Sequence, residues 1–184
     1  MKQFTSTPSV GFTDAVKSTL NNMTNFSGRT RRSEFWWSIL AYSLLVLVFS
    51  IVFGIFIPQN ATSIISTFLQ FLIFGTTVRR LHDSGKSGWW VGASWIVSAL
   101  GSIYTLTKGS MLFDMNTDPQ DLMEFVFSPL TLLMLSLQTI LSIIVIVFCL
   151  LDSDPKTNKY GESPKYKDMD NNPYGGHNAD IEAV

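Results

Sequence analysis

The sequence predicts an all-α integral membrane protein: a bundle of four transmembrane helices preceded by a short amphipathic helix. Three observations support this. Four long runs contain no charged side chain, tryptophan pairs open two of these runs, and basic residues gather in alternate connecting segments. Only 15% of the 184 residues are charged, against about 25% in an ordinary soluble domain. A single membrane domain is therefore expected.

The four predicted spans are residues 36–57, 61–78, 89–106 and 130–151. At about 1.5 Å per helical residue, each is long enough to cross a hydrocarbon core of roughly 30 Å. A buried helix of a soluble protein would show a polar stripe with a period of 3.6 residues. From Leu44 to Ile57 the first run has no such stripe, since Ser50 and Gly54 are its only interruptions. The runs therefore indicate membrane spans.

Tryptophan pairs mark two of the boundaries. Trp36 and Trp37 open the first run, and Trp89 and Trp90 open the third. Indole rings prefer the headgroup level, where the apolar ring and the N–H donor are both accommodated. Basic residues lie three or four positions before both pairs, at Arg32 and Lys86, so two independent signals place the membrane surface at the same points.

The distribution of lysine and arginine predicts the orientation. Twelve of the thirteen basic residues lie in the N-terminal segment, in the connection between the second and third spans, and in the C-terminal segment. Lys108 alone lies in the remaining connections. Because basic loops stay in the cytoplasm, both termini are expected to be cytoplasmic.

The segments around the spans are also assigned. Residues 1–9 are expected to be a flexible N-terminus, 10–24 an amphipathic interfacial helix, 25–164 the membrane domain and 165–184 a disordered cytoplasmic tail. The helix follows from the spacing of Phe12, Val16, Leu20 and Met23. The tail is polar and lacks apolar periodicity. The lone Cys149 lies in an apolar run and is expected to be a small buried hydrophobe.

The loop 107–129 is acidic. It contains Asp114, Asp118, Asp121 and Glu124, whose spacing fits no EF-hand loop. The expectation is a solvated external connector without a bound ion.

Polar residues concentrate beside the spans on the side of the two termini. An even number of spans brings three such segments to one face, and they are expected to form a cytoplasmic cluster. Its members are Arg29, Arg32, Glu34, Arg79, Arg80, His82, Asp83, Lys86, Asn158 and Tyr160. Partly desolvated charges in this zone need partners. With two acidic residues for several arginines, the cluster carries surplus positive charge.

These motifs resemble the DUF805 family of small bacterial inner-membrane proteins. The likeness rests on Gly28-Arg29, Arg32 and Glu34-Phe35-Trp36, on Arg79-Arg80-Leu81-His82-Asp83 with Gly85 and Ser87-Gly88-Trp89, and on Asn158 with Tyr160-Gly161. It implies a multi-pass protein of the inner membrane and implies no activity, since the family name records an unknown function.

Three classes of function are open. A binding or scaffold protein would use the basic face for anionic lipid headgroups, a partner membrane protein or a second copy, because arginine binds phosphate bidentately. A small transporter or channel subunit would need polar groups at the midplane, where Gln70 and Gln138 are present, although such residues more often join helices. A membrane-interface enzyme would use His82 and Asp83. The first is favoured, with no catalytic residue, metal, cofactor or nucleic acid expected.

Overall fold

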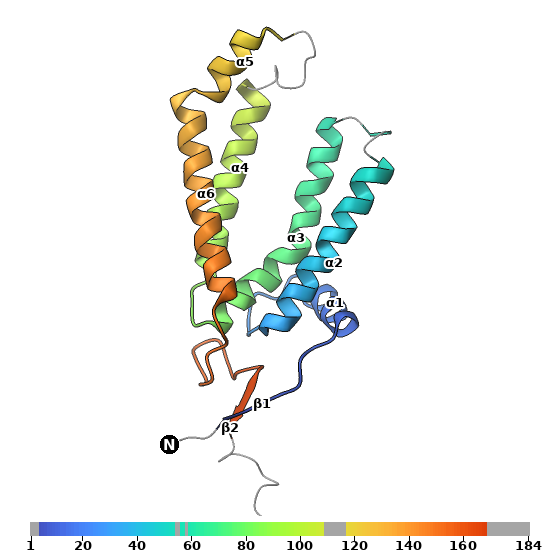
Figure 1. The fold of residues 1–184 in the computed structure, drawn as a ribbon, viewed down its shortest axis with the longest axis vertical. Helices are drawn as coiled ribbons and strands as arrows, with labels where there is room; N and C mark the ends of the chain where they lie inside the picture. Colours follow the sequence, from blue (N-terminus) through green and yellow to red (C-terminus); the bar gives the residue numbers. More distant parts are fainter. Residues whose placement is uncertain (1–3, 54–55, 58, 109–116, 169–184) are drawn as a thin grey trace, which may run out of the picture.

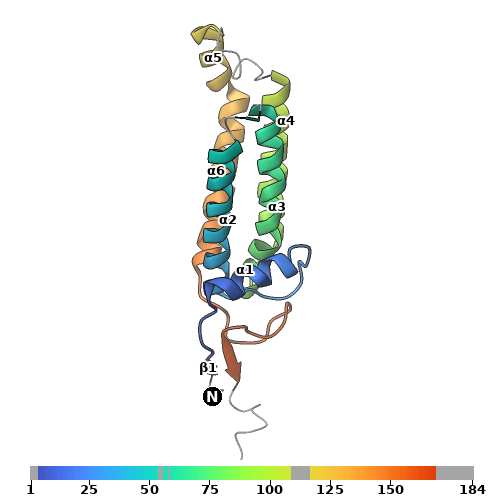
Figure 2. The same cartoon turned by 90° about the vertical axis from the view of Figure 1, so that its right-hand side faces the viewer.

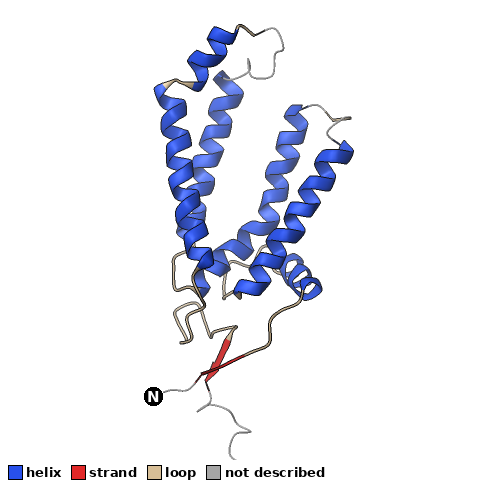
Figure 3. Ribbon diagram, viewed as in Figure 1, coloured by secondary structure: helices blue, strands red, loops and turns tan. Residues whose placement is uncertain are grey.

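A computed structural model describes residues 4–53, 56–57, 59–108 and 117–168. Within them the chain is mostly helical, with one small sheet (Figures 1 and 3). The elements are β1 (Phe4–Ser6), α1 (Phe12–Asn21), α2 (Arg32–Phe53), α3 (Gln59–Asp83), α4 (Trp89–Lys108), α5 (Pro119–Val126), α6 (Pro129–Leu150) and β2 (Tyr166–Asp168).

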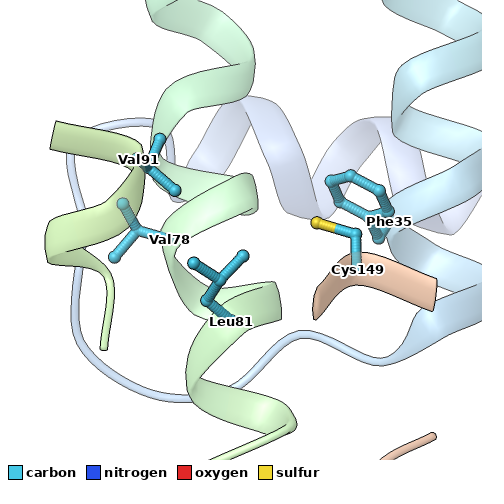
Figure 4. Packing of buried hydrophobic residues seen from close by; sticks show 5 residues of the cluster. All are labelled: Phe35, Val78, Leu81, Val91 and Cys149. Carbon is cyan, nitrogen blue, oxygen red and sulfur yellow. The ribbon is translucent and has the colours of Figure 1, made fainter. Parts of the chain in front are cut away.

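The four long helices form two antiparallel hairpins. α2 packs along α3, and α4 packs along α6. The hairpins meet at the end where α2 begins and α3 ends, which we call the joined end, and they diverge from it (Figure 1). The described hydrophobic core lies at the joined end, where Phe35, Val78, Leu81, Val91 and Cys149 pack together (Figure 4). The predicted role of Cys149 as a buried hydrophobe agrees with this position.

Two helices in the described part of the chain, α2 and α6, are long and apolar enough to cross a membrane. Each has 22 residues and turns most of its apolar side chains outward; Ile51, for example, is 64% exposed. A soluble protein would bury such a surface. α3 and α4 are less apolar, because α3 begins with Gln59-Asn60 and ends in a charged turn, and α4 carries several serines.

α1 lies across the joined end and packs against both α2 and α3 (Figure 2). It falls within the segment 10–24 for which the sequence predicts an amphipathic helix, and it buries Ala15 and Thr19. The backbone after it comes very close to α3: a Cβ atom built on Gly75 would lie 2.6 Å from the carbonyl oxygen of Met23. Only glycine permits this approach.

The structure departs from the predicted termini. Residues 4–6 and 166–168, expected to be flexible and disordered, form an antiparallel pair, with Thr5 opposite Lys167. Arg31 anchors β1 by donating to the carbonyl oxygen of Thr7 (2.8 Å), and Lys165 pairs with Asp152 (2.6 Å) beside β2. These partners are distant in sequence, so local composition could not reveal them. Residues 169–184 of the predicted tail lie outside the described residues.

The acidic loop 107–129, expected to be a solvated connector, is partly helical. α5 occupies part of the loop 107–129, and the Asp118 carboxylate caps its first turn by accepting a hydrogen bond from the Gln120 backbone N–H (2.8 Å). Asp118 therefore has a local structural role. Asp114 lies outside the described residues.

Candidate functional site

The last turn of α3 carries the central residues of the predicted cluster. The sequence predicts that the second span ends at residue 78, but the helix continues to Asp83. Helical geometry then places Arg80 and Asp83 one turn apart on one face. Arg80 and Asp83 are fully buried, and Arg79 and His82 retain only 4% and 8% of their exposure.

The Asp83 carboxylate is the meeting point of three segments. Its Oδ1 accepts from Arg29 Nε (3.0 Å), and its Oδ2 accepts from the Arg80 guanidinium and from Ser153 Oγ (2.5 Å). Burial raises the pKa of Asp83, while the Ser153 hydroxyl and the two guanidiniums oppose that rise. We call Arg29, Arg80, Asp83 and Ser153 the arginine clamp.

The remaining donors of the clamp reach backbone carbonyls. Arg29 donates to the carbonyl oxygens of Asp83 (3.1 Å), Asp154 (2.5 Å), Lys156 (2.8 Å) and Gly161 (3.2 Å). Arg80 donates to those of Cys149 (3.1 Å) and Leu151 at the end of α6. Cations are favourable at helix C-termini, where carbonyls lack partners within the helix. The clamp therefore ties the segment before α2, the end of α3 and the chain after α6 together.

His82 and Tyr160 extend this arrangement. Their rings stack with centroids 3.6 Å apart and planes inclined by only 4°. His82 Nδ1 lies 3.2 Å from the Gly28 carbonyl oxygen, and Asn158 Nδ2 donates to the His82 carbonyl oxygen (3.0 Å). Burial lowers the pKa of His82, which favours a neutral ring that donates through Nδ1–H.

Arg79 belongs to a separate network on the side of α1. Its guanidinium donates to Thr30 Oγ1 (3.1 Å) and to the carbonyl oxygens of Asn22 (2.8 Å) and Asn25 (3.0 Å). Glu34 accepts a hydrogen bond from Ser18 (2.6 Å) and forms no ion pair within the described residues. The predicted cluster is thus divided into a clamp and a second network that fastens α1.

Two predicted members lie on the surface. Arg32 and Lys86 are exposed, as is Lys159 beside Tyr160. Burial lowers the pKa of Arg80, and the charge of the nearby Arg32 adds to this effect. Lys86 Nζ lies 5.4 Å from the centre of the Phe148 ring. Lys159 Nζ lies 4.9 Å from the centre of the Tyr160 ring. We call these three exposed cations the basic rim.

The sequence did not predict one clamp residue, Ser153, or the backbone carbonyls that the clamp arginines contact. Ser153 and the carbonyls of Asp154, Lys156 and Gly161 belong to a polar segment that carries no periodic signal. Backbone acceptors are available at every residue, so sequence cannot show which of them an arginine will use. The sequence points to Gly161 only through the family motif; its φ of +127° shapes the turn that presents its carbonyl oxygen.

The acidic and imidazole groups of the site are engaged in contacts within the protein. Asp83 is occupied by two guanidiniums and a hydroxyl, and the His82 ring is stacked and hydrogen-bonded, so neither is placed as a free general base. Among the described residues, no group of three or more His, Cys, Asp or Glu side chains could hold a metal ion.

Comparison with known proteins identifies the family. A family model described as "Protein of unknown function (DUF805)" matches residues 23–162, which contain the whole clamp. Over 77 residues the chain is 35% identical to the inner membrane protein YhaI of Escherichia coli (strain K12), covering 40% of this chain. It is 34% identical over 77 residues to the inner membrane protein YhaH of the same strain, covering 39% of this chain.

The aligned part covers 64% of the length of each of these relatives. No solved structure matches the chain. The names of the relatives support a location in the bacterial inner membrane, in agreement with the apolar exteriors of α2 and α6. The chain belongs to the DUF805 family of proteins of unknown function.

Proposed function

We propose that this chain is a four-span inner-membrane protein, with both termini in the cytoplasm, that serves as a binding protein for anionic lipid headgroups. In this arrangement α3 and α4 cross the membrane beside α2 and α6. The joined end faces the cytoplasm, because twelve of the thirteen basic residues lie in segments at that end.

One observation carries the binding proposal: the buried arginines are already paired, whereas the side chains of the basic rim form no ion pair or hydrogen bond within the described residues. Arg29 and Arg80 use their donors on Asp83 and on carbonyls, so they act as a scaffold. Arg32, Lys86 and Lys159 are among the exposed cations at this end. Such cations at the cytoplasmic surface attract anionic lipids by about 1 kcal/mol per residue.

The enzyme and the transporter have less support than a lipid-binding protein. An enzyme would need a free base, but the His82 ring is stacked on Tyr160 and Asp83 is engaged within the clamp. A transporter would need an ionisable group within the spans, and the predicted spans contain no Asp, Glu, Lys or Arg.

The topology can be tested by cysteine labelling in intact cells. In a Cys149→Ala background, Gln120→Cys should react with an impermeant maleimide applied from outside. Glu162→Cys should react only after the inner membrane is permeabilised. Both positions precede or follow a predicted span by more than five residues. The reverse pattern would contradict the proposed orientation.

The binding proposal is tested by lipid retention. The triple variant Arg32→Gln, Lys86→Gln, Lys159→Gln should retain less phosphatidylglycerol than the unmodified protein when both are measured by native mass spectrometry from mild detergent. The matched control is Lys108→Gln, which removes the one basic residue at the opposite end. Equal retention by the triple variant and the control would refute a role for the rim.

A further inference from the structure

Two glutamines lie near the middle of long helices, and the structure treats them differently. Gln138 of α6 faces α4, where its Nε2 donates to Ser94 Oγ (3.0 Å) and also approaches Ser142 Oγ (3.3 Å). This amide therefore helps to join the α4–α6 hairpin, as polar side chains within membrane helices commonly do.

Gln70 of α3 has no such partner. Its side chain is exposed, and within the described part of the chain its amide makes no hydrogen bond. Several hydroxyl residues of the long helices bond to their own backbone instead; Thr77 and Thr139, for example, donate to the carbonyl oxygens of Ile73 (2.9 Å) and Leu135 (2.8 Å). Gln70 lacks even this local bond.

The surroundings of Gln70 explain its exposure. The neighbouring Phe71 and Phe74 pack against Trp95 of α4, with ring centroids 5.9 Å and 4.9 Å apart. Farther from the joined end the two hairpins diverge (Figure 1), and the Gln70 side chain is exposed. In a bilayer an amide on such a face would meet hydrocarbon without a hydrogen-bond partner, which is strongly unfavourable.

We propose that the face of α3 centred on Gln70 is the interface with a second copy of this chain, in which the two Gln70 side chains hydrogen-bond to each other. A primary amide is both donor and acceptor, so two copies related by a twofold axis can satisfy each other without any other group. The exposed ring of Phe71 supplies apolar contact beside the amide. The inference rests on the proposed four-span arrangement, which places Gln70 near the bilayer midplane.

The test is energy transfer between labelled copies in lipid vesicles. Donor and acceptor dyes are attached to Glu162→Cys in a Cys149→Ala background, and the protein-to-lipid ratio is varied. Transfer should rise to a plateau that fits a dimer. Gln70→Leu should weaken association by roughly three- to thirty-fold, as expected for interhelical hydrogen bonds in membranes, and Gln70→Asn should retain most of it.

Gln138→Leu is the matched control, because it makes the same change near the middle of α6 and should leave dimer dissociation within about twofold of the unmodified protein. Transfer no greater than random proximity, or an unchanged Gln70→Leu, would overturn the dimer. The labelling of Gln120→Cys and Glu162→Cys in cells separates the two proposals. A monomer with the expected labelling refutes the dimer alone, whereas inverted labelling refutes the proposed orientation.

Discussion

Within the described residues, Asp83 is the one acidic side chain that both arginines of the clamp contact. Such an arrangement does not by itself show a large net stabilisation, because burying three charges has a high desolvation cost. Both arginines nevertheless depend on Asp83, because two buried guanidiniums lose their counter-ion once it is removed. A third ion pair among the described residues, Lys165 with Asp152, is partly exposed to solvent and has no such dependence.

These two aspartates give a matched pair of variants. Asp83→Asn should lower the free energy of unfolding by roughly 3–5 kcal/mol, the usual cost of breaking a buried pair. Asp152→Asn should lower it by about 0–1 kcal/mol, as for exposed pairs. Chemical unfolding in detergent micelles measures both. Equal small losses would show that the clamp does not hold the fold.

The exposed pair also has a defined pH range. The hydrogen bond from Lys165 lowers the pKa of Asp152 to about 2. A lowered pKa in the folded state means that the contribution of this carboxylate is complete above its unfolded value near 3.8 and is lost as the pH falls towards 2. The difference between Asp152→Asn and the unmodified protein should therefore vanish over that interval.

The connection between α3 and α4 depends on a close approach of the Gly88 backbone to side chains of α3. A Cβ atom there would lie 2.6 Å from Val78 Cγ1 and 3.0 Å from His82 Nε2. Gly101, inside α4, has no such neighbour within 4 Å among the described residues. The sequence shows both residues as glycine, and only the packing distinguishes them.

Alanine substitution makes this difference measurable. Gly88→Ala should destabilise the protein by about 1–3 kcal/mol, because the added methyl overpacks the contact with α3. Gly101→Ala should stabilise it by up to about 1 kcal/mol, since alanine is the better helix former. Thermal unfolding in one detergent compares them. A Gly88→Ala protein as stable as Gly101→Ala would contradict the close packing.

The elements also show what sequence could predict. The long apolar runs yielded the positions of the four long helices, because hydrophobic length is a local property. The continuation of α3 to Asp83 was missed, since a charge-free run ends at the first arginine whereas a helix does not. The pairing of β1 with β2 was missed because it joins segments about 160 residues apart in the chain.

Across the whole chain, the sequence predicts that three polar segments lie on one face. In the structure these segments bring together Arg29, Arg80, Asp83, His82, Asn158 and Tyr160. The same reasoning could not separate buried from exposed arginines. That separation depends on which guanidiniums reach the carbonyls after α6, and the sequence does not encode those acceptors in side chains. Arg29 and Arg32, only one turn apart in sequence, consequently have different environments.

Arg29 of the clamp and Arg32 of the basic rim provide the most direct test of the division between the two groups. Arg29→Gln and Arg32→Gln are compared for phosphatidylglycerol retained in native mass spectra, recorded below the melting temperature of each variant. We expect Arg32→Gln to lose lipid while melting like the unmodified protein, and Arg29→Gln to melt earlier while keeping its lipid. Loss of lipid from Arg29→Gln, with full retention by Arg32→Gln, would contradict the account.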